Sequence, residues 1–205
     1  MRKGMTLALA LAVAGVLGAL AFSWERSMSP AERGKFLVKG LGCHGCHTPM
    51  IPGPGGWAVP DETRLLSGHP QNSPDPTPDV ARRDAYIFTG RTRTAWAGSW
   101  GTSFAANLTP DKDTGLGDWT EDMFIRTIRT GRHQGRSDGR EILPPMPWAN
   151  LSHATLGSSD ADLKAIWAYL RSLPPVKNRV PDPMPSTRQE NWKHQIHTGG
   201  ESSGL

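Results

Sequence analysis

The chain has 205 residues, which suits one domain with appendages. Its 23 glycines, 18 prolines and 8 tryptophans exclude a lean helical bundle and indicate long ordered loops held by aromatic packing. The formal net charge of +4 lacks the large clustered basic excess that nucleic-acid binding requires, so nucleic acid is excluded as a partner.

Residues 1–22 have the pattern of an export signal. Two basic residues at positions 2 and 3 precede an uncharged, Ala/Leu-rich run from Met5 to Phe22, and "ALA" at 19–21 fits an A-x-A cleavage site. The general secretory route is favoured, because neither twin arginines nor a lipid-carrying cysteine is present. The run is short for a spanning helix of about 20 residues, so cleavage is favoured over a retained inner-membrane anchor. Either outcome predicts a periplasmic protein.

The first expected helix runs from Pro30 to Lys39. Ser29 precedes it as the cap, Pro30 suits the first helical position, and Phe36 and Leu37 are its apolar residues. The helix leads directly into the stretch that holds the two cysteines of the chain. It therefore delivers that stretch to the core.

The stretch "CHGCH", residues 43–47, has the C-x-x-C-H pattern of c-type haem attachment. In this pattern Cys43 and Cys46 form thioethers to the vinyl groups of the haem, and His47 ligates the iron. One turn of helix places both thiols on the same side, and the next residue brings its imidazole under the ring. The sequence thus predicts one covalently attached haem c with its iron.

Three other interpretations of the cysteine pair are weaker. A disulfide across so short a loop would be strained and would constrain almost nothing. A zinc site would need more ligands, and the other histidines form no second paired motif. A thioredoxin-like redox pair would follow a strand and precede a helix, whereas here a helix precedes and "TPMIPGPGG" follows.

Residues 49–103 form a long insert that is rich in proline and contains His69, Trp96 and Trp100. The insert could cover the haem or dock a partner, but a packed Ω-like loop is favoured because Trp is usually buried. Residues 95–108 are the part of the chain in which one or two short strands are expected.

Two further helices carry clear end signals. The segment 120–130 begins at Thr120 as its cap and ends before Gly131. The segment 159–173 begins at Ser159, spaces its apolar residues at i, i+3, i+4 and i+7, and stops before Pro174. Five arginines cluster near His133, just before the loop that holds Met146, and they could neutralise haem propionates, meet an acidic partner, or form an ordinary solvated surface: Arg126, Arg129, Arg132, Arg136 and Arg140.

Met146, in "ILPPMPW", is the best candidate for the second axial ligand of the iron. Prolines on both sides fix its backbone, so its thioether can be presented with little further loss of entropy. A methionine between prolines has no helix face on which to serve as core filler. Met184 also lies between prolines and is the main alternative, followed by Met50 and His133.

The sequence resembles class I monohaem c-type cytochromes, and more closely the exported bacterial members with the motifs "FAANLTPD" and "LPPMPW", here residues 104–111 and 143–148. The resemblance implies a mainly α, cytochrome c-like fold of several helices around a covalent haem, with His47 and Met146 as axial ligands. It also implies that the first and last helices cross, through Gly34, Phe36 and either Trp167 or Tyr169. The cytochrome domain would cover residues 29–175, followed by an extended or disordered tail, 176–205.

These features predict an electron carrier that is not itself an enzyme. Histidine and methionine ligation would suit one-electron transfer between periplasmic or membrane partners such as a dehydrogenase, a respiratory complex or a terminal oxidase. Two alternatives remain. In one, the methionine is labile and the haem acts as an enzyme or binds a gas or peroxide. In the other, the chain is a fixed electron-transfer subunit of a dehydrogenase.

Overall fold

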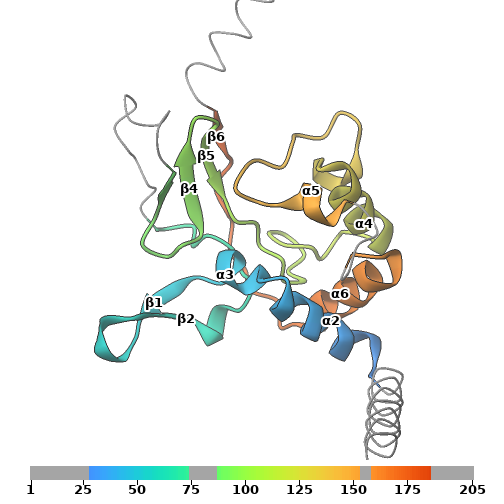
Figure 1. Ribbon diagram of the computed structural model, residues 1–205, viewed down its shortest axis with the longest axis horizontal. Helices are drawn as coiled ribbons and strands as arrows, with labels where there is room; N and C mark the ends of the chain where they lie inside the picture. The colour runs from blue at the N-terminus through green and yellow to red at the C-terminus, as the bar shows by residue number, and fades with distance from the viewer. Residues whose placement is uncertain (1–27, 74–86, 153–157, 186–205) are drawn as a thin grey trace, which may run out of the picture.

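The computed structural model describes residues 28–73, 87–152 and 158–185, so the expected export signal and the end of the expected tail lie outside it. These residues form a mainly helical structure with long connecting loops (Figure 1), as the sequence predicts. Five α-helices are present among them: α2 (Pro30–Gly40), α3 (Cys43–His47), α4 (Glu121–Thr130), α5 (Trp148–Leu151) and α6 (Asp160–Ser172). None of the helices in these ranges is long and apolar enough to cross a membrane.

The ends of the longer helices follow the local signals. Ser29 caps α2 and Ser159 caps α6, each in a capping box with the acidic residue three positions later. Thr120 caps α4 by accepting a hydrogen bond from the Met123 amide. Gly131, with φ of 66°, ends α4 in the left-handed conformation that suits glycine. The three helices predicted at these positions are thus present with nearly the expected bounds.

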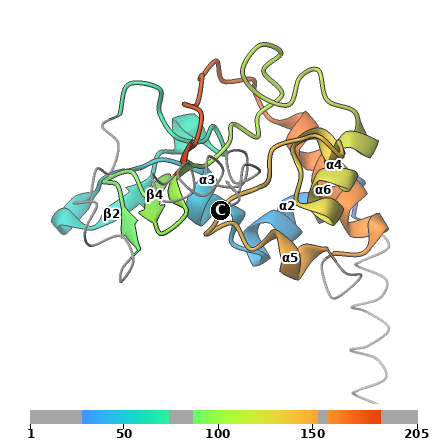
Figure 2. The same ribbon diagram turned by 90° about the horizontal axis from the view of Figure 1, so that it is seen from above.

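Helices α2 and α6 pack closely against each other (Figures 1 and 2). A Cβ placed at Gly34 would lie 1.9 Å from the Ala165 oxygen and 2.8 Å from the Tyr169 Cβ, so only glycine fits there. Gly34 and Val38 are the buried residues of α2. The expectation for Phe36 is wrong: its side chain is 60% exposed, because it lies two positions from each buried residue and faces the other side of the helix.

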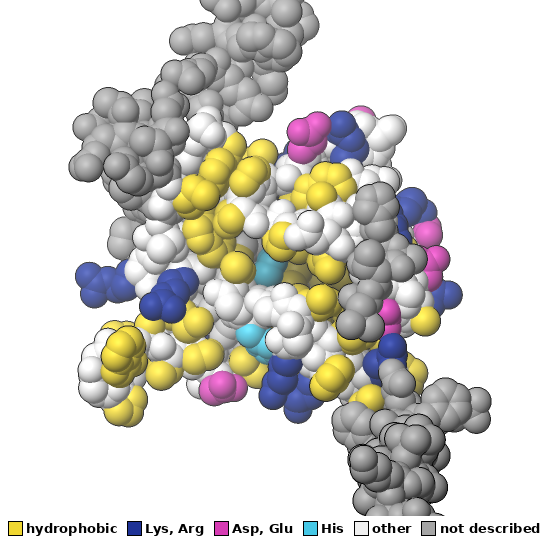
Figure 3. Space-filling model, viewed as in Figure 1, with side chains coloured by type: hydrophobic (Ala, Val, Ile, Leu, Met, Phe, Trp, Pro, Cys, Tyr) yellow, Lys and Arg dark blue, Asp and Glu magenta, His cyan; other side chains and the backbone are white. Residues whose placement is uncertain are grey.

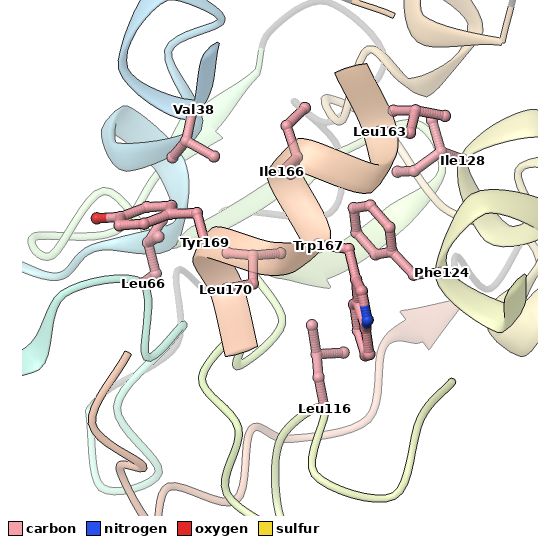
Figure 4. Packing of buried hydrophobic residues seen from close by; sticks show 10 residues of the cluster. All are labelled: Val38, Leu66, Leu116, Phe124, Ile128, Leu163, Ile166, Trp167, Tyr169 and Leu170. Carbon is pink, nitrogen blue, oxygen red and sulfur yellow. The ribbon is translucent and has the colours of Figure 1, made fainter. Parts of the chain in front are cut away.

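The hydrophobic core lies where α6 meets α2, α4 and the loop before α4 (Figure 4). Tyr169 faces α2, while Trp167 stacks on Phe124 of α4 with ring centroids 5.6 Å apart. Of the two aromatic residues expected at the helix crossing, Tyr169 is therefore the one that meets Gly34. The cluster also contains Leu66 and Leu116 from loops, which ties those loops to the helices.

The structure contains more strands than expected, all of them short. Within residues 95–108 it forms β4 (Ala95–Gly98) and β5 (Gly101–Phe104), as predicted. These lie between β3 (Phe88–Thr89) and β6 (Met184–Pro185) in one antiparallel sheet, and β1 (Met50–Pro52) pairs with β2 (Ala58–Pro60) in a second. Three short 3-10 helices complete the described part: Pro54–Gly56, Glu62–Arg64 and His133–Gly135. Because β6 pairs with β5, the segment after α6 returns to the insert.

Candidate haem site

The two cysteines lie on α3, one helical turn apart. Both are free thiols, and each is partly buried. Burial raises the pKa of Cys43 to about 11 and also raises that of Cys46. Two unpaired thiols one turn apart on one helix are what covalent attachment to a haem requires.

His47, the last residue of α3, is held in its neutral form. Its side chain is 9% exposed, and its Nδ1 lies 2.9 Å from the carbonyl oxygen of Ala106. A carbonyl can only accept, so Nδ1 carries the proton and Nε2 keeps the lone pair. Burial lowers the pKa of His47, which further favours the neutral ring. A buried neutral imidazole with one nitrogen fixed by a carbonyl is the usual form of a metal-ligating histidine.

Two loops, residues 67–71 and 105–107, support His47 on the side where its backbone lies. The Gly68 amide donates to the His47 carbonyl oxygen at 2.8 Å, and the His69 amide donates to the Ala105 carbonyl at 2.9 Å. Gly68, with φ of 77°, lies so close to the second loop that an added Cβ would be 2.7 Å from the Ala106 oxygen. Neither Gly68 nor Ala106 was predicted from the sequence, because Ala106 acts only through its backbone and one glycine in a loop is a weak signal.

Met146 lies on a loop that two hydrogen bonds fix on the N-terminal side of the methionine. The Ser103 hydroxyl of β5 donates to the Pro144 carbonyl oxygen at 2.5 Å, and the Ile142 amide donates to the Gly131 carbonyl at 2.8 Å. Met146 is partly buried and packs against the same hydrophobic cluster that Cys43 contacts. The structure therefore connects the haem motif and the candidate methionine through one core.

The other ligand candidates lie in different surroundings. Met184 is in β6 and is 41% exposed, while Met50 is in β1. His133 makes an edge contact with Trp119, with ring centroids 5.2 Å apart. Unlike Met146, neither of these two methionines is among the described residues that pack against the hydrophobic cluster.

Hydrophobic side chains surround a recess near the centre of the described face, between the β4–β5 sheet and the part that carries α4 and α5, and a histidine lies in it (Figure 3). An apolar recess, two thiols, a neutral imidazole and a thioether together match the donor set and surroundings of haem c. A separate polar cavity of about 370 Å³ lies between residues 64–72 and 176–178 and contains none of these residues. The residues present therefore fit the predicted cofactor.

The arginines near His133 are mostly engaged with the protein itself. Arg129 donates to the carbonyl oxygens of Leu151 and Ser158 and pairs with Asp160. Three more arginines form ion pairs with nearby acids: Arg126 with Asp122, Arg132 with Glu141, and Arg136 with Asp138. These contacts favour the interpretation of the cluster as an ordinary surface.

Comparison with known proteins found dehydrogenase components. The chain is 25% identical over 185 residues to the cytochrome c subunit of the quinone alcohol dehydrogenase of Gluconobacter oxydans, which covers 89% of this chain and 30% of the relative. It is 41% identical over 69 residues to the gluconate 2-dehydrogenase cytochrome c subunit of Pantoea cypripedii, which covers 34% of this chain and 14% of that one. The fructose dehydrogenase cytochrome subunit of Gluconobacter japonicus is 30% identical over 89 residues, which covers 40% of this chain and 17% of the relative.

The chain thus spans less than a third of the length of each of these relatives. No protein-family model matches it. The cytochrome subunits among the relatives agree with a c-type cytochrome that contains haem and transfers electrons without being the catalytic subunit.

Proposed function

We propose that this chain is a periplasmic monohaem cytochrome c that carries single electrons. Cys43 and Cys46 bind the haem through thioethers, and His47 and Met146 are its axial ligands. When bound, the haem supplies a centre that gains and loses one electron. The observation that carries the proposal is His47: within the C-x-x-C-H motif, the carbonyl of Ala106 occupies Nδ1 and leaves Nε2 for the iron.

The contributions of the protein are to fix the two ligands and to exclude water. The two loops behind α3 hold His47, and the Ser103 bond holds the loop of Met146. Apolar side chains around the recess (Figure 3) would keep the haem surroundings dry, and methionine ligation raises the potential. A closed coordination shell of this kind suits electron transfer better than substrate binding.

Replacing Met146 with Ala tests the ligand set. Met146→Ala, produced in a host that matures cytochromes c, should keep its covalent haem but lose the sulfur-to-iron charge-transfer band of the oxidised protein. Its reduction potential should fall, and the reduced protein should bind carbon monoxide. The matched control is Met184→Ala, which removes an exposed methionine between prolines and should leave the spectrum unchanged. The opposite result would assign the ligand to Met184.

The partner that we propose is a dehydrogenase, with the chain as its electron-transfer subunit. The support is that the relatives with cytochrome subunits in their names all belong to dehydrogenases. Purification of the tagged native protein without crosslinking should recover a dehydrogenase in fixed ratio to this chain. Recovery of the chain alone, with electron exchange only by collision, would instead identify a freely diffusing carrier.

A further inference from the structure

The three residues 176–178, which follow α6, cross the two loops that support His47. Asn178 is 1% exposed, and every polar atom of its amide group is used. Its Nδ2 donates to the carbonyl oxygens of Ser67 at 2.7 Å and His69 at 2.9 Å, and its Oδ1 accepts from the Gln71 amide at 3.0 Å. One buried side chain thus fixes three points of the loop 67–71.

That loop holds the backbone of the axial histidine. Gly68 lies between the two carbonyls that Asn178 binds, and its amide donates to the His47 carbonyl oxygen at 2.8 Å. The contact between Asn178 and His47 is therefore indirect and passes through one glycine.

The second supporting loop is tied to the same three residues. Asn107, which follows the Ala106 carbonyl that binds His47, donates from Nδ2 to the Val176 carbonyl at 2.8 Å. The Val176 amide in turn donates to the Thr109 hydroxyl at 3.1 Å. Both loops behind the histidine are consequently joined by the segment after α6.

We infer that Asn178 is a positioning residue for the proximal histidine, acting through the loop 67–71, whose Gly68 amide binds the His47 carbonyl and whose His69 amide binds the Ala105 carbonyl next to Ala106. The inference rests on the proposed function, because it assigns Asn178 a role in tuning the haem iron. A hydrogen bond from the ring N–H to a fixed carbonyl makes an imidazole a better electron donor to its metal. Loosening the loops would weaken that bond, and the reduced iron would be favoured.

Substitution of Asn178 in the full-length holoprotein tests the role. Asn178→Ala should retain covalent haem and shift the reduction potential upward, and the Gly68 amide should exchange its hydrogen at least about tenfold faster. Asn178→Asp, which keeps the size and the acceptor for Gln71 but removes the NH2 donor, should speed the exchange of the Gly68 amide in the same way. A merely structural role would lower stability without moving the potential.

Two control variants separate these causes. Asn72→Ala removes an exposed asparagine just after the loop 67–71. Asp162→Asn weakens the distant contact between α2 and α6. Both should keep the wild-type potential and the wild-type exchange of Gly68. If Asn178→Ala and Asn178→Asp behave like these controls, the inference is overturned.

Amide hydrogen exchange in the wild-type protein tests the coupling between Asn178 and Gly68 even if no variant at Asn178 can be purified. The amides of Gly68 and Asn178 should exchange as one cooperative unit, with the same opening free energy. Clearly different opening free energies would contradict the inference. A wild-type protein without covalent haem would instead overturn the proposed function, and the exchange comparison would still report whether the two segments are coupled.

Discussion

Gly68 allows two loops to meet directly behind His47. Its φ of 77° lies in a region that side chains rarely adopt, and its Cα faces the carbonyls of Ala105 and Ala106. The Ala106 carbonyl is also the acceptor for the His47 ring. A larger residue at position 68 would therefore displace the Ala106 carbonyl and with it the ring of His47.

Gly68→Ala should lower the free energy of unfolding by about 1–3 kcal/mol, since the new methyl group meets two carbonyl oxygens in a strained backbone conformation. It should also change the reduction potential, because the Ala106 oxygen must move. Urea unfolding followed by absorbance and circular dichroism gives the first quantity, and a redox titration gives the second.

Gly40→Ala is the matched control for this change. Gly40 lies at the end of α2 with no atom near the position of an added Cβ and with no positive φ. The substitution should leave both stability and potential within experimental error of the wild type. If the two substitutions changed the free energy of unfolding and the reduction potential equally, the close packing at Gly68 would not be the cause.

Side-chain chemistry could be predicted at this site, whereas its backbone support could not. C-x-x-C-H is a contiguous motif, so the sequence alone identifies Cys43, Cys46 and His47 as haem-binding candidates. Ala106 contributes only a carbonyl, which every residue possesses. The glycine of "LSGH" was the one available signal for the contact from behind, and a single glycine is too common to interpret without the fold.

Helices were predicted better than strands for a similar reason. The ends of α2, α4 and α6 follow from capping residues and acidic or basic neighbours within a few positions. Strand β6 is short and pairs with β5, which lies far earlier in the chain, so no local pattern marks it. Met146 as the axial ligand remains a prediction. Its role depends on the haem iron, which would be held about 100 positions earlier in the chain, so no local pattern can establish it.

The contact between α2 and α6 contains a partly buried ion pair that should make stability depend on pH. Arg33 binds Asp162 at 2.6 Å, and the Asp162 side chain is only 7% exposed. Burial alone would raise the pKa of Asp162, but hydrogen bonds from Ser159 and Arg33 outweigh it and hold the pKa below its ordinary value of 3.8. The stabilisation is therefore present above about pH 4 and is lost as the pH falls through the lower, folded-state pKa.

Asp162→Asn should lower the free energy of unfolding at pH 7 by about 1–3 kcal/mol, because Arg33 keeps its charge without a carboxylate partner. The difference from the wild type should shrink as the pH falls below about 4, which unfolding curves at several pH values would detect. Asp160→Asn is the control, because Asp160 is 72% exposed in its pair with Arg129 and should contribute little. A constant difference at all pH values would exclude the carboxylate as the cause.

The whole chain should depend on its cofactor for stability. The described face has a central apolar recess, and Cys43 and Met146 both pack against the core (Figure 3). Replacing both Cys43 and Cys46 with Ala should give a colourless protein whose intact mass equals that of its amino acids. It should also unfold at lower urea concentration than the holoprotein, because the attached haem is buried against apolar side chains only when the chain is folded. A double variant as stable as the holoprotein would contradict this dependence.

Asn178 and Ser67 are 111 positions apart in the chain, and contacts of such long range form slowly and late. Synthesis proceeds from the N-terminus, so the cysteines emerge from the ribosome well before the segment that closes over their neighbouring loops. An enzyme that attaches haem would thus act on a chain in which residues 176–178 have not yet joined the two loops next to α3. The contacts of Asn178 with the loop 67–71 would then form last and would fix the His47 imidazole after the haem has been attached.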